Sequence, residues 1–449
     1  MWRRVVGAQG AVQLISAIAA MRSPEAISLG SGVAESIENI LVIHDLSTTP
    51  EQANEFADCL KSLASLCESW TRIVYIDAES NATLQNHLKM GGWERAKESL
   101  RKLIGCSHCD ELILGQNLLF LNSLLAQTFP EADKSCYGDG LAVNFTAEYY
   151  SPDHNPITAG MNSLSASKKS RKLKAWWDNV RSWFRGRRDG NSGQNTFYQI
   201  TSLKKTAPSE TSKKVTLKPL AKEKYRVAFD RKYLLFANML DEVWPNFVQL
   251  PVESFINSFE RIASNLHRFD HGTCHRLSEK VANVEQTIVL LSSNFSETKR
   301  MQLDGEVECY KKWIHGCRVS SDTLIVIKSH PRDSYQKIER IRTNLSDIGC
   351  QVEVLSDPWT FYVPFESIYL RYIRPYSSVK QRLDIICTSS SCLSLEYLFQ
   401  QPCHLGFGTE LVEKYFAPKW VPLRLLHEAD LMRLTDFSRS RTASRKAAA

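Results

Sequence analysis

The sequence contains no long hydrophobic run. Nothing in its 449 residues approaches the roughly 18 consecutive apolar residues expected of a membrane-spanning helix. The mildly apolar residues 5–20 are interrupted by Gln9, Gly10 and Gln13, so they lack the continuous apolar core of a signal peptide. We therefore expect neither a membrane span nor a secretory leader.

Metal-binding and disulfide signatures are also sparse. Twelve cysteines are too few for a disulfide scaffold in so long a chain, so we expect reduced thiols in a cytoplasmic protein. Cys106 and Cys109 flank His108 with zinc-ligand spacing, but no second Cys-x-x-Cys pair exists, and His315 and Cys317 could complete a site only by a coincidence of folding. The Asp-x-Asp signature that chelates the cation of a nucleotide sugar is absent as well. We expect no metal and no cofactor.

The net excess of positive charge lies in one segment. The net charge is +7, yet residues 168–188 alone hold nine Lys or Arg against one Asp, a local charge of +8. The remainder is close to neutral, which argues against a basic surface that binds nucleic acid over the whole protein.

Short apolar runs alternate with longer amphipathic segments in two parts of the chain, which predicts parallel sheets covered by helices. The first series of predicted strands comprises residues 2–6, 40–43, 73–76 and 112–114. The second comprises residues 287–291, 324–327, 352–355, 384–387 and 404–407. The predicted fold class is therefore α/β, with two Rossmann-like halves.

Composition divides the chain into four segments. Residues 1–150 and 224–437 hold the two predicted Rossmann-like domains, and residues 438–449 form a tail that we expect to be disordered. Residues 151–223 form an insertion rich in Ser, Thr, Gly, Asn and Lys, a composition typical of exposed or disordered segments.

The run Asp384–Phe399 has the pattern of a strand, a hydroxyl-rich turn and an amphipathic helix. Ser389, Ser390 and Ser391 offer hydroxyls, free backbone N–H groups and the positive end of a helix dipole, which together suit a phosphate. An ordinary N-cap run is the alternative, because serine is favoured at helix starts without any ligand.

A second loop suited to anions follows the predicted strand 323–327. It contains Lys328, His330, Pro331 and Arg332. Because the carboxyl ends of parallel strands converge on a crevice, we expect this loop and the serine turn, at the ends of neighbouring strands, to face one anionic ligand. The alternative is a capping or surface histidine in a turn stiffened by proline.

In the first half, an acid lies between two glycines, Gly138-Asp139-Gly140, after a short predicted strand. Flanking glycines let the backbone approach a ligand closely while the carboxylate projects outward. Asp139 is therefore a candidate general base, although Asp-Gly is also one of the commonest turn signals.

Together these elements resemble the bacterial-type sialyltransferases and polysialyltransferases that use CMP-sialic acid. Those families carry an acid-acid-Gly, a His-Pro and a Ser-Ser or Ser-Thr motif in that order, matched here by Gly138-Asp139-Gly140, His330-Pro331 and Ser389-Ser390-Ser391. The surroundings of the first two motifs are most similar to the polysialyltransferase branch. The resemblance spans roughly residues 3–150 and 225–425 and departs from the family in having Gly138 at the first acidic position.

The resemblance implies a GT-B arrangement, in which two Rossmann-like domains face a central cleft. It implies inverting, metal-independent transfer of sialic acid from CMP-sialic acid to a glycan or glycolipid hydroxyl. Asp139 would be the base, and His330 would protonate or hydrogen-bond the departing phosphate. Substrate contacts are expected from Gln13, Gly140, Lys328, Pro331, Arg332, Glu366, Ser389, Ser390 and Ser391.

Two alternatives stay open. The donor could be another CMP-activated ulosonic acid such as Kdo, because the phosphate-binding residues would serve equally. The chain could also be a non-catalytic glycan- or membrane-binding protein that kept the fold after losing the acid at position 138.

The basic segment 168–188 predicts an amphipathic helix. Apolar residues recur along it at helical spacing, and Trp176, Trp177 and Trp183 lie on the apolar face among cations. Such a helix suits an anionic membrane surface or a polyanionic glycan, and we expect peripheral attachment at the inner face of the membrane. Docking on the protein's own core and nucleic-acid binding through Trp stacking are the alternatives, and we expect no nucleic-acid partner.

Overall fold

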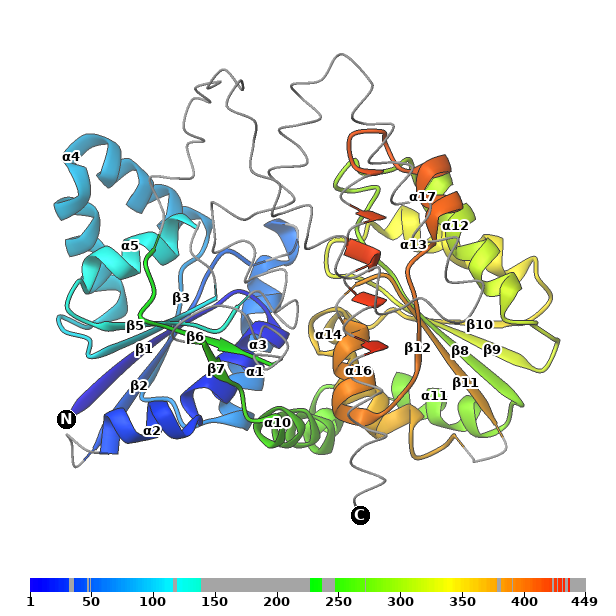
Figure 1. Cartoon of the computed structure of the whole chain (residues 1–449), viewed down its shortest axis with the longest axis horizontal. Coiled ribbons are helices and arrows are strands. Elements are labelled where there is room, and N and C mark those ends of the chain that lie inside the picture. The colour runs from blue at the N-terminus through cyan, green and yellow to red at the C-terminus, as the bar shows by residue number, and fades with distance from the viewer. Residues whose placement is uncertain are drawn as a thin grey trace, which may run out of the picture.

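The computed structural model contains two parallel β-sheets that lie side by side along the long axis of the molecule (Figure 1). Helices cover both faces of each sheet, which confirms the predicted α/β class with two Rossmann-like domains. The structure describes residues 1–31, 36–46, 48, 50–115, 119–138, 227–235, 247–270, 272–377, 381–389, 391–421, 424–425, 427–429, 431–432 and 435–436.

Among the described residues, the first sheet has seven strands in the order β3-β2-β1-β4-β5-β6-β7, and all neighbours run parallel. Its strands are β1 (Trp2–Ala8), β2 (Ile37–Ile43), β3 (Arg72–Tyr75), β4 (Glu111–Leu114), β5 (Asp133–Cys136), β6 (Arg231–Leu234) and β7 (Phe247–Gln249). The strands predicted in the first part of the chain correspond to β1–β4, and β5 is the short strand expected before Asp139.

Alternate residues of these strands face two helical layers. In β1, Val6 packs in an apolar cluster with α1 and α3, whereas Val5 packs on the other face with α4 and α5. The helices of this domain and the helix that leaves it are α1 (Ala11–Met21), α2 (Pro24–Ser31), η1 (Pro50–Gln52), α3 (Ala53–Cys67), α4 (Ala78–Ile104), α5 (Phe120–Thr128) and α10 (Val252–Asn265).

The first sheet also receives two strands from beyond the insertion. β6 pairs with β5 and β7 pairs with β6, although both follow residue 224, where we predicted that the C-terminal domain begins. Both strands are short, and β6 starts with Arg231 and Lys232, so neither contains an apolar run like those of β1–β4. The structure therefore places β6 and β7 with the N-terminal sheet, which corrects the predicted boundary.

In the part of the chain that the structure describes, the second sheet has five parallel strands in the order β10-β9-β8-β11-β12. They are β8 (Gln286–Leu291), β9 (Thr323–Lys328), β10 (Gln351–Leu355), β11 (Arg382–Cys387) and β12 (Cys403–Leu405), which confirms the five strands predicted in this part. One face packs against α12 (Leu303–Gly316), α13 (Tyr335–Ser346) and α17 (Thr409–Tyr415). The other packs against α11 (Thr273–Ala282), α14 (Pro358–Tyr362), α15 (Phe365–Ile368), η6 (Tyr369–Ile373) and α16 (Ser391–Phe399).

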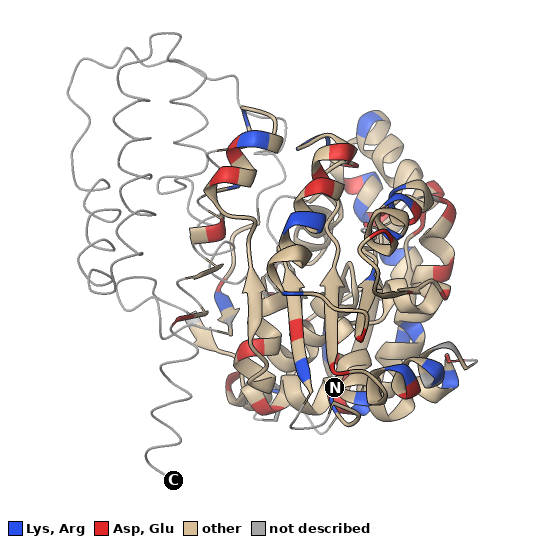
Figure 2. Ribbon diagram, turned by 90° about the vertical axis from the view of Figure 1, so that its right-hand side faces the viewer, with Lys and Arg blue, Asp and Glu red and all other residues tan. Residues whose placement is uncertain are grey.

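Charge follows this layering. In the view of Figure 2, Lys, Arg, Asp and Glu lie mainly on the helices with both signs interspersed, whereas the strands are largely uncharged. Every residue of β8 and β9 is buried, as expected for parallel strands covered on both faces.

The two domains meet at the carboxyl ends of their strands. Tyr362 of α14 stacks on Phe56 of α3 with ring centroids 4.7 Å apart, and its hydroxyl donates to Glu55 Oε2 at 3.3 Å. The Thr48 hydroxyl donates to the Pro331 carbonyl at 3.1 Å. Because Thr48 follows β2 and Pro331 follows β9, the carboxyl ends of both sheets point toward the domain junction, which is the predicted GT-B arrangement.

Across the part of the chain that the structure describes, no helix has both the length and the apolar character required to cross a bilayer. All twelve cysteines are free thiols, and all except Cys350 are buried. This agrees with the expectation of reduced thiols.

Candidate active site

Three strands of the second sheet end side by side where the two predicted anion-binding loops begin. β9 leads into the His330 loop (Lys328–Arg332), and β11 leads into the serine turn (Ser389–Ser391). We predicted that these two strands are neighbours, but β8 lies between them. The end of β8 contributes Ser292 and Ser293, which connect the two loops.

Ser292 and Asp333 fix the backbone of the His330 loop. The His330 N–H donates to Ser292 Oγ at 3.0 Å and to Asp333 Oδ2 at 2.8 Å. The Ser292 hydroxyl is itself hydrogen-bonded to Asp333. Ser292 and Asp333 are buried, so solvent does not compete for these bonds.

The His330 side chain is a neutral hydrogen-bond donor. The Arg332 N–H donates to His330 Nδ1 at 3.1 Å, which leaves the ring proton on Nε2. Burial, and then the charges of Lys328 and Arg332, lower the pKa of His330 to about 3. At neutral pH the uncharged ring can therefore donate a hydrogen bond from Nε2 to an anion. Arg332 itself is exposed, and Pro331 is half-buried at the contact with Thr48.

A buried ion cluster supports Asp333. Lys337 Nζ lies 2.7 Å from Glu306 Oε1, 2.9 Å from Asp333 Oδ1 and 3.1 Å from Glu297 Oε2. Burial raises the pKa of Asp333 and of Glu306, and Lys337 opposes both shifts. Burial alone would lower the pKa of Lys337, but the carboxylates outweigh it and raise that pKa. Lys337 also donates to the Ser293 carbonyl, so the cluster joins α12 and α13 to the end of β8.

Lys328 is a second buried cation at this edge of the sheet. Its Nζ donates to the carbonyls of Ser329 at 2.9 Å and Phe361 at 3.4 Å. Burial lowers the pKa of Lys328 to about 8, against the opposing charges of Asp333 and Glu366. An ammonium group has three donors, so these two bonds leave capacity for an anion.

The serine turn opens α16 at the same edge. α16 begins at Ser391, and Ser389 Oγ donates to Ser391 Oγ at 3.3 Å. Ser390 lies outside the described residues. The Ser293 hydroxyl is hydrogen-bonded to the hydroxyl of Thr388, so the end of β8 is joined to this turn as well as to the His330 loop. The structure therefore brings the two predicted anion-binding loops together.

Glu366 lies behind the serine turn. It is buried in the first turn of α15, and burial raises its pKa. The Ser394 hydroxyl is hydrogen-bonded to Glu366 and lies 2.7 Å from the Ser391 carbonyl. The carboxylate thus supports the first turn of α16, and its contact with a cytidine ribose stays a prediction.

On the N-terminal side, Gln13 lies in the first turn of α1, directly after β1. A Cβ added at Gly10 would lie 2.7 Å from Gln13 Oε1, so the Gln13 side chain folds back over this turn. Two buried polar residues here were not predicted: Gln9, and His44, whose Nδ1 lies 3.2 Å from Asp45 Oδ2. Both follow strand ends, which is the signal that could have identified them.

The predicted base, Asp139, and its neighbour Gly140 lie outside the described residues. The chain just before them is at the carboxyl edge of the first sheet, because the Tyr137 hydroxyl donates to the Gly7 carbonyl at 2.8 Å. Gly138 has a φ of 87°, in the left-handed region where side chains are disfavoured. Glycine adopts this conformation without steric cost, so Gly138 is compatible with the backbone at the first position of the acid-acid-Gly motif.

The Cys-x-x-Cys segment does not gather metal ligands. The Cys106 thiol donates to the His108 carbonyl at 2.8 Å, and the Cys109 thiol donates to the Glu111 carbonyl at 3.0 Å. Within the described ranges, this segment takes part in no group of three metal-ligand atoms.

Of the comparisons with known proteins, one gives a family match and one gives no match. Residues 19–379 match the family model of alpha-2,8-polysialyltransferase (POLYST), a range that includes Asp139, His330 and Glu366 and ends before the serine turn. Comparison with the curated proteins gives no match.

Solved structures similar to this chain share about a tenth of its sequence. The S. aureus MnaA–UDP co-structure has a TM-score of 0.45 and 10% identity, with 90% of this chain and 79% of that chain covered. A putative UDP-N-acetylglucosamine 2-epimerase from Listeria monocytogenes has a TM-score of 0.44 and 9% identity, with 97% and 90% covered. The UDP-GlcNAc 2-epimerase from Neisseria meningitidis bound to UDP-GlcNAc has a TM-score of 0.42 and 10% identity, with 92% and 85% covered.

These structural likenesses are too weak to support an argument about function. The family match is different, because it extends over well more than half of the chain. The chain therefore belongs to the alpha-2,8-polysialyltransferase family, a family of sialyltransferase enzymes.

Proposed function

We propose that this enzyme transfers sialic acid from CMP-sialic acid to a hydroxyl of a glycan or glycolipid, with inversion at the anomeric carbon and without a metal ion. The observation that carries the proposal is that Ser292 and Ser293 hold the His330 loop and the serine turn at one edge of a parallel sheet. Family membership supports sialyl transfer.

The CMP phosphate would bind between the serine turn and Lys328. The serine hydroxyls and the first N–H groups of α16 are suited to a phosphate, and the helix dipole favours its charge. Lys328, with Arg332 at the exposed side of the loop, would neutralise that charge through charge-assisted hydrogen bonds.

His330 would stabilise the leaving group by hydrogen bonding rather than by proton transfer. Its neutral ring carries the proton on Nε2, and the low pKa makes an imidazolium scarce in the free enzyme. A fixed donor aimed at the phosphate favours the transition state, in which negative charge develops on CMP.

Asp139 would act as the general base. Its carboxylate accepts the proton of the acceptor hydroxyl while that oxygen attacks the anomeric carbon of sialic acid. The bond between that carbon and the phosphate oxygen breaks, and CMP leaves with the electron pair. Attack opposite to the leaving group gives inversion.

The buried Lys328 predicts a pH dependence of CMP binding. Its pKa is about 8 in the free protein, and a bound phosphate raises it, so binding takes up a proton. CMP affinity should therefore be high below pH 8 and fall as the pH rises through 8. The second pKa of a phosphate is about 6, so the phosphate keeps its charge across this range.

Calorimetric titration of the full chain with CMP between pH 7 and about pH 9 tests this dependence. Lys328→Arg keeps a charge at all these pH values, and Lys328→Met removes it. The CMP affinity of both variants should therefore not fall as the pH rises through 8. An affinity of the unmodified protein that stays constant across the range, or a decline that persists in both variants, would remove Lys328 from the phosphate site.

For the acceptor side, we propose peripheral attachment at an anionic membrane surface on the cytoplasmic side, through residues 168–188. These residues lie outside the described part of the chain, and the proposal rests on their charge of +8 and the three tryptophans. Each cation near an anionic leaflet contributes about 1 kcal/mol, so partial contact suffices.

Deletion of residues 165–190 should move the protein from anionic liposomes to the soluble fraction in a sedimentation assay, and added salt should do the same to the intact protein. CMP binding by the deletion variant is the control for folding. If the variant loses CMP binding and unfolds, the apolar face of the predicted helix packs on the protein itself, and the membrane proposal fails.

A further inference from the structure

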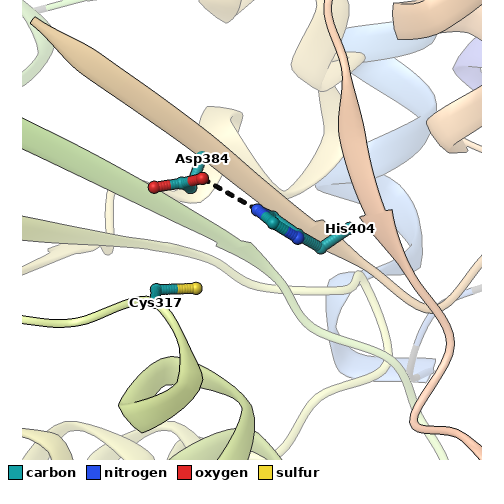
Figure 3. A group of neighbouring side chains, drawn as sticks. All are labelled: Cys317, Asp384 and His404. Atoms are coloured by element: carbon teal, nitrogen blue, oxygen red, sulfur yellow. Dashed lines mark hydrogen bonds and ion pairs between the residues drawn. The ribbon is translucent and has the colours of Figure 1, made fainter.

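A second group of reactive side chains lies in the C-terminal domain, away from the loops described above. Cys317, Asp384 and His404 come from three different elements, and their ligand atoms all lie within 4.8 Å of one another (Figure 3). Cys317 follows α12, Asp384 is the third residue of β11, and His404 is in the edge strand β12. Asp384 lies in the amino-terminal half of its strand, whereas the His330 loop and the serine turn follow strand ends.

The sheet register explains why these residues meet. His404 pairs with Ile386, and Asp384 precedes Ile386 by two residues, so Asp384 and His404 are diagonal neighbours on one face of the sheet. Ile386 and Cys317 belong to the apolar cluster between this face and α12. The end of α12 therefore brings the thiol to the carboxylate and imidazole.

Surrounding hydrogen bonds hold the carboxylate and the cysteine backbone in place. Gln286 Nε2 donates to Asp384 Oδ2 at 2.8 Å and to the Cys317 carbonyl at 3.1 Å. The Thr323 hydroxyl donates to Gln286 Oε1 at 3.2 Å, which orients the amide. Arg382 Nε lies 2.7 Å from Asp384 Oδ2, and Arg382 Nη2 donates to Oδ1 at 3.2 Å. His404 Nε2 lies 2.8 Å from the same Oδ1. Outer-shell partners of this kind orient metal ligands.

We propose that Cys317, Asp384 and His404 bind a zinc ion through Sγ, Oδ1 and Nε2, with water as the fourth ligand. Thiolate, imidazole and carboxylate are the ligand types of zinc, and three protein ligands with one water is an established coordination. The half-exposed side chain of His404 leaves a path to solvent. This inference is independent of the transfer reaction proposed above.

Binding replaces the hydrogen bond between Asp384 and His404. The imidazole coordinates as the neutral ring, with its proton on Nδ1, and the Cys317 thiol releases one proton to solvent as the Zn–S bond forms. Asp384 keeps the contacts of its Oδ2 with Gln286 Nε2 and Arg382 Nε. The ion would then link the end of α12 to β11 and to the edge strand β12, which stabilises this side of the domain.

Cobalt is a suitable probe, because a cysteine ligand gives Co²⁺ a thiolate-to-metal charge-transfer band. The full chain is stripped with a chelator and titrated with Co²⁺, and Zn²⁺ is then added. We expect one equivalent of Co²⁺ to give this band, Zn²⁺ to abolish it, and Zn²⁺ to raise the thermal unfolding midpoint of the unmodified protein.

Cys317→Ser should abolish the charge-transfer band. His404→Gln should abolish the binding of one equivalent of Co²⁺ and the rise in the thermal unfolding midpoint that Zn²⁺ causes. His404→Gln changes a partly exposed side chain, so its fold should persist when compared by circular dichroism. Cys350→Ser and His315→Gln, which lie outside the cluster, are matched controls and should behave as the unmodified protein. Absence of the band in the unmodified protein, or its survival in both cluster variants, would overturn the proposal.

Discussion

His330→Ala and Asp139→Asn should both abolish sialyl transfer, but only His330→Ala should weaken CMP binding. His330 lies beside the proposed phosphate site, held there by Ser292 and Asp333. Asp139 follows β5 in the sequence and is proposed to act on the acceptor rather than on CMP. Loss of a general base costs about 10²–10⁴-fold in rate, and loss of one donor to a developing anion costs about 10²–10³-fold.

Transfer is measured as CMP released in the presence of an acceptor, and CMP affinity is measured by calorimetry on the same preparations. His315→Ala, a change to an exposed histidine on α12, serves as the control and should leave both quantities unchanged. Substantial transfer by Asp139→Asn would mean that another group is the base. Unchanged CMP affinity in His330→Ala would remove His330 from the donor site.

Lys337→Met should lower the free energy of unfolding by about 3–5 kcal/mol, because it leaves buried carboxylates without their cation. Lys337, Asp333 and Glu306 are all buried, so none of their charges is compensated by water. Urea unfolding at neutral pH measures the loss. Lys102→Met is the matched control, because Lys102 pairs with Glu98 on the surface and its removal should have little effect.

The loss should depend on pH in a defined direction. Without Lys337, burial keeps the pKa values of Asp333 and Glu306 raised above those of the unfolded chain, so the folded state binds protons more strongly. Stability linked to these groups is then present at low pH and lost as the pH rises through their folded pKa values. The difference in free energy of unfolding between Lys337→Met and the unmodified protein should therefore become smaller as the pH falls. A difference that is constant from neutral to acidic pH would contradict the proposed cause.

The sequence predicted the sheets better than the limits of the domains. Strands such as β8 and β9 are continuous apolar runs, because both of their faces are covered, and such runs can be recognised without a structure. β6 and β7 have three or four residues and pair across the insertion, so neither composition nor periodicity identifies them. The same limit applies to the placement of β8 between β9 and β11, which depends on pairing between distant segments.

The residues that we propose to contact a phosphate were identified from the sequence, whereas the residues that hold those loops in place were not. Ser292-Ser293 follows an apolar strand, as Ser389–Ser391 does, so the same pattern could have identified it. Lys337 and Glu306 gave no such signal, because a charged residue on an amphipathic helix usually faces solvent. Only the packing of α12 and α13 against the end of β8 shows that both are buried.

Analysis of the reaction products by nuclear magnetic resonance tests whether this family member uses CMP-sialic acid as its donor. The enzyme is incubated with an oligomer of α2,8-linked sialic acid and either CMP-sialic acid or CMP-Kdo. We expect CMP to accumulate only with CMP-sialic acid, together with new sialyl residues of inverted anomeric configuration. Consumption of CMP-Kdo instead, or binding of CMP without consumption of either donor, would show that CMP-sialic acid is not the donor of a transfer reaction here.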